Sequence, residues 1–199
     1  MYGKYNGGLT REQFLFYEIR VVASLIAQGL DKDGIILKIQ SENLFQFPTE
    51  RMTASIANTC FQRLEALGSD VLVYHLAHSS TDVARQINLY AIMKHNRIVW
   101  DFMTRVIGEK YRTQEFEYTR KDLNVFISRL QEQNDAIAGW SDSTISKIKQ
   151  VLTKCLVECS FLDSIKATQL NPVVIAPELE DEIRTNNDVA ALAAFNCFR

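Results

Sequence analysis

Residues 140–176, WSDSTISKIKQVLTKCLVECSFLDSIKATQLNPVVIA, hold the pattern that decides the fold of this chain. Ser141 is a favourable N-cap, and the negative charge of Asp142 suits the start of a helix. Apolar side chains then recur at helical spacing and predict one buried stripe: Ile145, Ile148, Leu152, Cys155 and Cys159. The segment therefore predicts an amphipathic helix that begins after Ser141.

The face opposite this stripe combines hydroxyl, amide and ammonium groups: Ser143, Ser146, Lys147, Gln150 and Lys154, with Lys149 beside them. Polar groups of this kind on a rigid helix suit the phosphates and base edges of a nucleic acid. The same pattern is also typical of the solvated face of a helix that only packs against its own domain. Both interpretations are open on this pattern alone.

The residues that follow this helix predict two short strands. They span residues 165–170 and 173–175, and the Asn-Pro pair between them predicts a turn. Before the helix, Thr119 and Asp122 predict the capped start of another helix. Two helices followed by a small β-hairpin have the outline of a winged helix-turn-helix.

The first half of the chain predicts a bundle of helices. Thr10 and Gln13 form a capping-box pattern, so the first helix is expected to begin at Thr10. A third helix is expected over residues 49–68, and its polar face carries Arg51, with Arg63 at the margin. Both arginines are candidate phosphate contacts, and the alternative is the polar outside of a helical bundle.

Helical periodicity lapses between residues 110 and 118, where aromatic residues alternate with charged ones. We therefore place a domain boundary in this region. Residues 1–113 are expected to form an all-helical N-terminal domain, and residues 114–199 a winged helix-turn-helix domain with an acidic and apolar tail. The predicted fold class is mainly α, with the β-hairpin as its sheet element.

The formal net charge of −2 is poor for a nucleic-acid binder, but the charges are unevenly placed. Residues 94–121 include seven basic and four acidic side chains, which indicates a local patch that attracts phosphate in a salt-sensitive way. Four residues of this region extend the candidate phosphate track: Arg97, Arg105, Arg112 and Lys121. The alternative at its start is a purely local role, in which Asn96 caps a helix and Arg97 pairs with Asp101.

The chain lacks the sequence motifs of common catalytic, phosphate-loop and zinc sites. Its four cysteines are scattered and mostly occupy apolar helical positions, which indicates buried thiols in a reducing compartment. We therefore expect no enzymatic activity, no metal and no cofactor. The sequence also lacks a signal-peptide pattern or an apolar run long enough for a membrane span, so we expect a soluble, cytoplasmic protein without membrane contact.

Four segments resemble those of a known protein family: KYNGGLTREQFLFYEIRVVASLIAQGL (4–30), QINLYAIMKHNRIVWDFM (86–103), WSDSTISKIKQVLTKCLVECSFLDS (140–164) and LNPVVIAPEL (170–179). In order and spacing they resemble the BrxA family of BREX bacteriophage-exclusion systems, over nearly the whole chain. The resemblance implies a nearly all-helical protein with a winged helix-turn-helix and an N-terminal bundle similar to the NusB fold. It also implies DNA binding, antiviral defence and partners from the same system, namely a methyltransferase, an ATPase and a phosphatase-like protein.

We therefore expect a non-catalytic protein that binds double-stranded DNA mainly through its phosphates. In the C-terminal part, the candidate phosphate contacts are Lys147, Lys149, Lys154 and Lys166, and the candidate contacts to backbone or base edges are Ser143, Ser146 and Gln150. Because this face lacks the Arg and Asn residues that read bases with paired hydrogen bonds, we expect weak sequence preference. Two other functions are open: a protein-interaction adaptor that assembles defence-system partners, and an RNA-binding protein similar to NusB.

Overall fold

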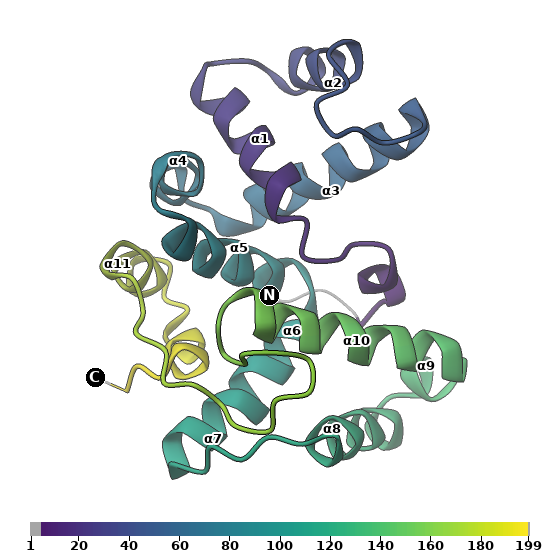
Figure 1. Ribbon diagram of the computed structural model, residues 1–199, viewed down its shortest axis with the longest axis vertical. Helices are drawn as coiled ribbons and strands as arrows, with labels where there is room; N and C mark the ends of the chain where they lie inside the picture. Colours follow the sequence, from purple (N-terminus) through teal and green to yellow (C-terminus); the bar gives the residue numbers. More distant parts are fainter. Residues whose placement is uncertain (1–4, 199) are drawn as a thin grey trace.

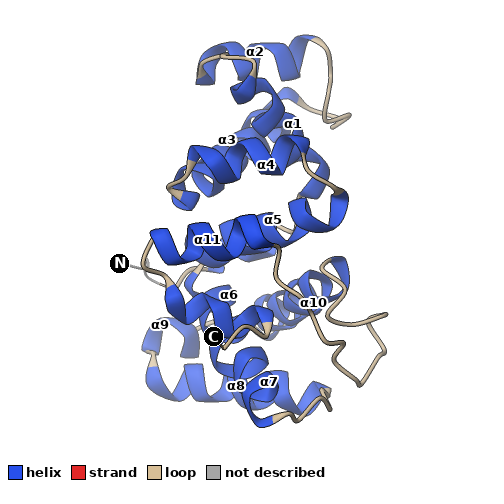
Figure 2. Ribbon diagram, turned by 90° about the vertical axis from the view of Figure 1, so that its left-hand side faces the viewer, coloured by secondary structure: helices blue, strands red, loops and turns tan. Residues whose placement is uncertain are grey.

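Helices build almost all of the structure in the computed structural model, which describes residues 5–198 (Figures 1 and 2). The α-helices are α1 (Phe16–Ala27), α2 (Lys32–Ser41), α3 (Glu50–Leu67), α4 (Asp70–His78), α5 (Thr81–His95), α6 (Arg97–Phe102), α7 (Gly108–Thr113), α8 (Arg120–Gln133), α9 (Asp135–Ala138), α10 (Asp142–Glu158) and α11 (Pro177–Thr185). Two 3-10 segments, η1 (Gly7–Thr10) and η3 (Val189–Phe195), and a π-helical segment, η2 (Met103–Ile107), complete the elements. The predicted mainly α class is confirmed.

Several helices begin where side chains cap them, as the sequence predicted. The Thr49 hydroxyl accepts a hydrogen bond from the backbone N–H of Met52 at 3.2 Å, and Ser141 caps α10 in the same way. Thr119 and Asp122 form the expected capping box at the start of α8. Such local pairs fix the ends of the helices without help from the rest of the chain.

The start of the first helix was predicted wrongly, and Arg63 explains why. Its guanidinium donates to the carbonyls of Glu12 at 2.6 Å, Gln13 at 2.8 Å and Phe14 at 3.3 Å. Because these carbonyls accept hydrogen bonds from a side chain of α3, the expected helix does not form over them, and α1 begins only at Phe16. The expected exposure of Arg63 is also wrong, because the residue is 0% exposed and lies beyond the reach of a phosphate in solution.

The core is organised around α5. Leu89 to Met93 are five consecutive residues that are all buried, which is typical of a helix surrounded by other helices. α5 contacts α1, α3, α4, α6 and α11. Its C-terminal neighbours α6, η2 and α7 continue one another as a single long helical rod across the lower part of the molecule in Figure 1.

The C-terminal tail returns to elements of the first half of the chain. α11 packs against α4 and α5, and η3 packs against η2 and α7. The approach is close: a Cβ added at Gly108 of α7 would lie 3.0 Å from the Cβ of Ala193. The division at residue 113 stays a prediction, and the tail contacts the helices that come before it.

The expected β-hairpin is not formed in residues 5–198. Its first half pairs instead with the segment before α8: Tyr118 N–H donates to the Thr168 carbonyl, and one antiparallel bridge joins Glu117 to Gln169. The second half bonds to the Gln86 side chain, which accepts from Ala176 N–H and donates to the carbonyl of residue 174. Because the two halves have different partners, residues 161–176 form an extended loop that protrudes beside α10 (Figure 2).

Within the described range, none of the helices combines the length and the apolar character that crossing a bilayer requires.

Candidate nucleic-acid interface

α10 lies at the surface with one face in the core. All five residues of the predicted apolar stripe are buried: Ile145, Ile148, Leu152, Cys155 and Cys159. At the N-terminal end, the Ser141 hydroxyl accepts a hydrogen bond from Thr144 N–H at 3.3 Å and fixes the first turn. Local capping and core burial together hold the helix rigidly, so its opposite face has a defined shape.

The outer face of α10 is open to solvent along its length. Ser143, Ser146, Gln150 and Lys154 are exposed and follow one another at spacings of three and four residues, which places them in one row. The sequence prediction therefore brings these four side chains together correctly. Ser143 lies close to the cap, with its hydroxyl 2.9 Å from that of Ser141.

Two further lysines flank this row. Lys147 and Lys149 are two positions apart, so they project from opposite margins of the helix, and both are half-buried. The Lys149 ammonium group donates to Oδ1 of Asn124 on α8 at 2.8 Å. Among residues 5–198, no carboxylate forms an ion pair with Lys147, Lys149 or Lys154. The charge of these three lysines is therefore available to an anion.

The loop after α10 contains Lys166. Asn171 pins this loop: its side chain donates to the Ser160 carbonyl at 3.1 Å and to Asp163 at 2.8 Å. Lys166 is exposed, and its neighbour Ile165 is 69% exposed. The predicted wing residue is therefore accessible, although the wing is a loop.

The arginines of the predicted phosphate track lie on the α6–α7 rod and are already paired with carboxylates. Arg97 and Arg105 contact Asp101 at 3.6 Å and 3.2 Å, and Arg112 contacts Glu109 at 3.2 Å. The Arg97–Asp101 pair and the Asn96 cap expected under the local alternative are both formed. These arginines carry less uncompensated charge than the lysines of α10.

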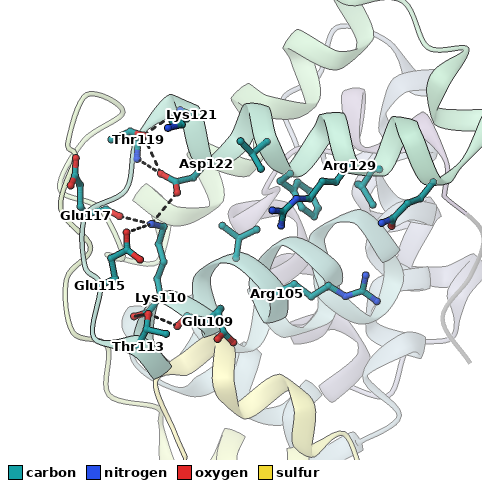
Figure 3. Close-up of a pocket in the computed structure, with 15 residues that line it drawn as sticks. Arg105, Glu109, Lys110, Thr113, Glu115, Glu117, Thr119, Lys121, Asp122 and Arg129 are labelled. Carbon is teal, nitrogen blue, oxygen red and sulfur yellow. Dashed lines mark hydrogen bonds and ion pairs between the residues drawn. The ribbon is translucent and has the colours of Figure 1, made fainter.

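A groove of about 660 Å³ runs between α8 and the α6–α7 rod (Figure 3). At one end, Lys110 donates to the Glu117 carbonyl at 2.6 Å and lies 3.0 Å from Asp122. Burial raises the pKa of Asp122, but hydrogen bonds from Thr119 and Lys110 outweigh burial, and the net pKa is lowered. This carboxylate is therefore held in its ionised form.

Three further cations line the groove: Lys121 beside Thr119 and Asp122, and Arg105 and Arg129 toward the other end (Figure 3). Arg129 was missed in the sequence analysis. The spacing of Lys121, Val125 and Arg129 could have indicated it, because residues four positions apart share one side of a helix. The predicted Lys121 is exposed, so it belongs to this groove as well as to the outer surface of α8.

Arg51 lies apart from the other candidates. It is exposed in the first turn of α3, near α2 at the upper end of the molecule in Figure 1, whereas α10 lies in the lower half. The structure therefore does not bring Arg51 together with the lysines of α10.

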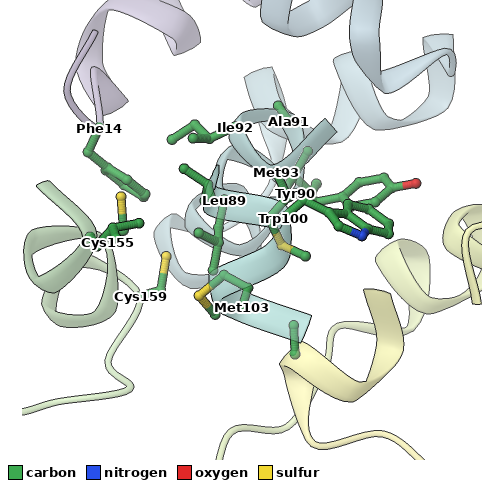
Figure 4. Packing of buried hydrophobic residues seen from close by; sticks show 14 of the residues in the cluster. Phe14, Leu89, Tyr90, Ala91, Ile92, Met93, Trp100, Met103, Cys155 and Cys159 are labelled. Atoms are coloured by element: carbon green, nitrogen blue, oxygen red, sulfur yellow. The ribbon is translucent and has the colours of Figure 1, made fainter. Parts of the chain in front are cut away.

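The cysteines contribute to packing. Figure 4 shows Cys155 and Cys159 turned toward the apolar side chains of α5. Burial raises the pKa of Cys60 and of Cys155 to about 12, so both stay as thiols at neutral pH. Among the described residues, His, Cys, Asp and Glu side chains form no group of three or more that could bind a metal ion.

Comparisons with known proteins cover nearly the whole chain. The sequence model of the BrxA family matches residues 3–187. A "BREX protein BrxA" of Bacillus cereus (strain H3081.97) is 33% identical over 83% of this chain and 82% of its own length. Proteins of the same name from Paramagnetospirillum magneticum and Escherichia coli O9:H4 are 26% and 25% identical, over 86% and 87% of this chain and 85% and 81% of their own lengths.

One solved structure has the same fold. It is the crystal structure of an uncharacterized protein from Magnetospirillum magneticum, with a TM-score of 0.81 and 23% sequence identity. The similarity covers 97% of this chain and 98% of the other. The arrangement of helices described above is thus found in a second protein.

Proposed function

Because this chain belongs to the BrxA family, we propose that it is a DNA-binding component of a BREX bacteriophage-exclusion system, with α10 as its main contact to the duplex. The proposal assigns it a part in defence against phage, in the cytoplasm, as a non-catalytic protein. Other BREX proteins are its proposed protein partners.

One observation carries the proposal: the outer face of α10 is exposed, and it bears neutral hydrogen-bonding groups between lysines that form no ion pair with a carboxylate in the described residues. Ammonium groups attract phosphates, while hydroxyls and an amide donate to phosphate oxygens or base edges. α10 has 17 residues, and at about 1.5 Å per residue its outer face is about 25 Å long. This length is enough to contact successive phosphates.

The proposed interface has the order of elements of a winged helix-turn-helix. α8 and α9 precede α10, and the loop after α10 returns to pair with the segment before α8 through Glu117 and Gln169. Lys166 belongs to this returning loop, which follows α10 in the chain as a wing follows a recognition helix. The similarity of the N-terminal bundle to the NusB fold stays a prediction.

The charge distribution supports binding with weak sequence preference. Lysine contacts to phosphates carry no sequence information, and Gln150 is the one amide in the exposed row. Because the proposed contacts are mainly to phosphates, log affinity is expected to fall linearly with log salt, with a slope set by the number of lysines that contact a phosphate. The duplex is thus recognised chiefly as a regular array of phosphates.

A competition experiment tests the proposal. Labelled duplex bound to the full-length protein is titrated with unlabelled duplex DNA and with single-stranded RNA of the same length. We expect the duplex to compete at lower concentration, because the rigid row on α10 fits a regular backbone. Stronger competition by RNA, or no binding to the labelled duplex at low salt, would overturn the proposal.

A second candidate function is that of an adaptor, and α4 favours it. Val71 and Tyr74 are 50% and 57% exposed, and the Tyr74 ring stacks on exposed His78 with centroids 4.4 Å apart. Exposed apolar and aromatic side chains of this kind occur at protein interfaces. An adaptor would capture BREX proteins equally well before and after nuclease treatment, whereas capture through DNA would be lost.

A further inference from the structure

The groove between α8 and the α6–α7 rod has a positive end. Lys110 and the carboxylates around it occupy one end, and Arg105 and Arg129 lie toward the other (Figure 3). Another lining carboxylate, Glu109, pairs with Arg112. Arg129 is exposed, and no ion pair or hydrogen bond engages its guanidinium within residues 5–198. An anion that enters the groove therefore meets a free guanidinium on α8.

Arg105 lines the same groove, and a buried carboxylate contacts it. The Asp101 side chain is 4% exposed, and it contacts Arg105 at 3.2 Å while Arg105 itself remains 62% exposed. Tyr5 also donates a hydrogen bond to Asp101. Because a buried carboxylate is costly without its partners, Asp101 restrains the arginine. The π-helical segment η2 contains Arg105, and such segments occur frequently at functional sites.

The floor of the groove is apolar. Val106 from the rod and Phe126 and Leu130 from α8 line it, and the last two are 7% and 4% exposed. Apolar walls lower the effective dielectric constant, so the attraction between a guanidinium and an anion is stronger here than on an open surface. Arginine pairs are also well suited to phosphate, because each guanidinium can donate two parallel hydrogen bonds.

We propose that this groove binds a backbone phosphate of the same duplex that α10 contacts, with Arg129 and Arg105 as donors from two different helices. The inference rests on the proposed function and extends it to a second binding site. α8 separates the groove from α10, and the Lys149–Asn124 hydrogen bond fixes these two helices to each other. A duplex that crosses α8 would thus be held on both sides of this helix.

The test compares two double variants of the full-length protein. R105Q/R129Q removes the groove donors, and K32Q/K38Q removes the same charge from α2, which lies at the upper end of the molecule in Figure 1. Duplex affinity is measured at several salt concentrations. We expect the salt slope of R105Q/R129Q to be shallower by about 0.9, since one phosphate contact is lost. The slope of K32Q/K38Q is expected to equal that of the wild type.

A hydroxyl-radical footprint gives a readout independent of affinity. R105Q/R129Q should lose protection at one edge of the wild-type footprint and keep it where α10 binds. The single variant R129Q, which breaks no contact within the described part of the chain, should show about half of the slope change. Its thermal unfolding midpoint should match that of the wild type, which separates a binding effect from an unfolding effect.

Two results would contradict the groove proposal, and one of them would also contradict the proposed function. An unchanged slope and footprint in R105Q/R129Q, together with weaker binding when the α10 lysines are replaced, would overturn the groove proposal alone. Absence of duplex binding by the wild type would overturn the proposed function as well.

Discussion

The Lys149 ammonium group on α10 donates a hydrogen bond to Oδ1 of Asn124 on α8, with 2.8 Å between the two atoms. The bond joins the helix that carries the proposed duplex contact to the helix that lines the groove. It also uses one of three donors of the lysine, so two remain for a phosphate. The two helices therefore present their cations in a fixed relative position.

The first prediction concerns this bond. Replacement of Asn124 by Ala frees Lys149 but keeps its charge, so we expect duplex affinity to fall less than in Lys149→Ala. The free energy of unfolding should fall by about 0.5–1.5 kcal/mol, the usual contribution of one hydrogen bond. Anisotropy titration and denaturant unfolding measure the two effects, and equal affinity of Lys149→Ala and the wild type would remove Lys149 from the interface.

The second prediction concerns Arg63, which is 0% exposed and binds three carbonyls. Arg63→Met leaves the carbonyls of Glu12 and Gln13 without their donor, whereas the Phe14 carbonyl still accepts from Asn88 Nδ2 at 2.7 Å. We expect the free energy of unfolding to fall by at least about 2 kcal/mol, because each of the two acceptors left without a donor costs about 1–3 kcal/mol. The exposed Arg51 on the same helix is the matched control, and Arg51→Met should change stability by at most about 0.5 kcal/mol. Equal stability of the two variants would contradict the account.

The third prediction concerns pH. His95 lies 3.2 Å from Glu12, and this hydrogen bond lowers the pKa of Glu12 below its usual value of 4.5. A carboxyl whose pKa is lower in the folded state stabilises the protein above the pKa of the unfolded chain. This contribution is lost as the pH falls through the folded-state pKa. We expect the stability difference between the wild type and Glu12→Gln to shrink as the pH falls from about 5 to about 3.

Denaturant unfolding of both proteins across that pH range checks the sign. A stability difference that grows toward low pH would mean that the pKa of Glu12 is raised, and would contradict the geometry of the His95 contact.

The fourth prediction concerns thiol reactivity. All four cysteines are buried, and with a pKa of about 12 only about one molecule in ten thousand carries a thiolate at Cys60 or Cys155 at pH 8. We expect slow reaction of the native protein with a disulfide reagent and fast reaction of all four thiols after unfolding. Rapid modification of two thiols in the native state would contradict their placement in the core.

Much of the fold could be predicted from the sequence because helix caps and apolar stripes are local signals. The Thr49, Asn96, Thr119 and Ser141 caps and the buried stripe of α10 all form as expected. Each depends on residues within a few positions of one another, so the chain pattern contains the information. The exposed row on α10 follows from the same periodicity.

The errors arose where distant residues compete for backbone groups. Arg63 is far from Glu12 in sequence, yet its bonds to the carbonyls of Glu12 to Phe14 replace the helix start expected at Thr10. Gln86 likewise binds the backbone of the predicted second strand. The groove at Arg129 depends on the packing of α8 against the α6–α7 rod, which no local pattern predicts.

The central claim is that lysines on the outer face of α10 bind the phosphates of a DNA duplex. Its most direct test is the salt dependence of duplex affinity for the wild type and for Lys147→Ala/Lys154→Ala, two lysines without an ion pair in the described structure. The account predicts a linear fall of log affinity with log salt, with a slope shallower by about 1.8 in the variant, because two phosphate contacts are lost. Identical slopes for the two proteins would contradict it.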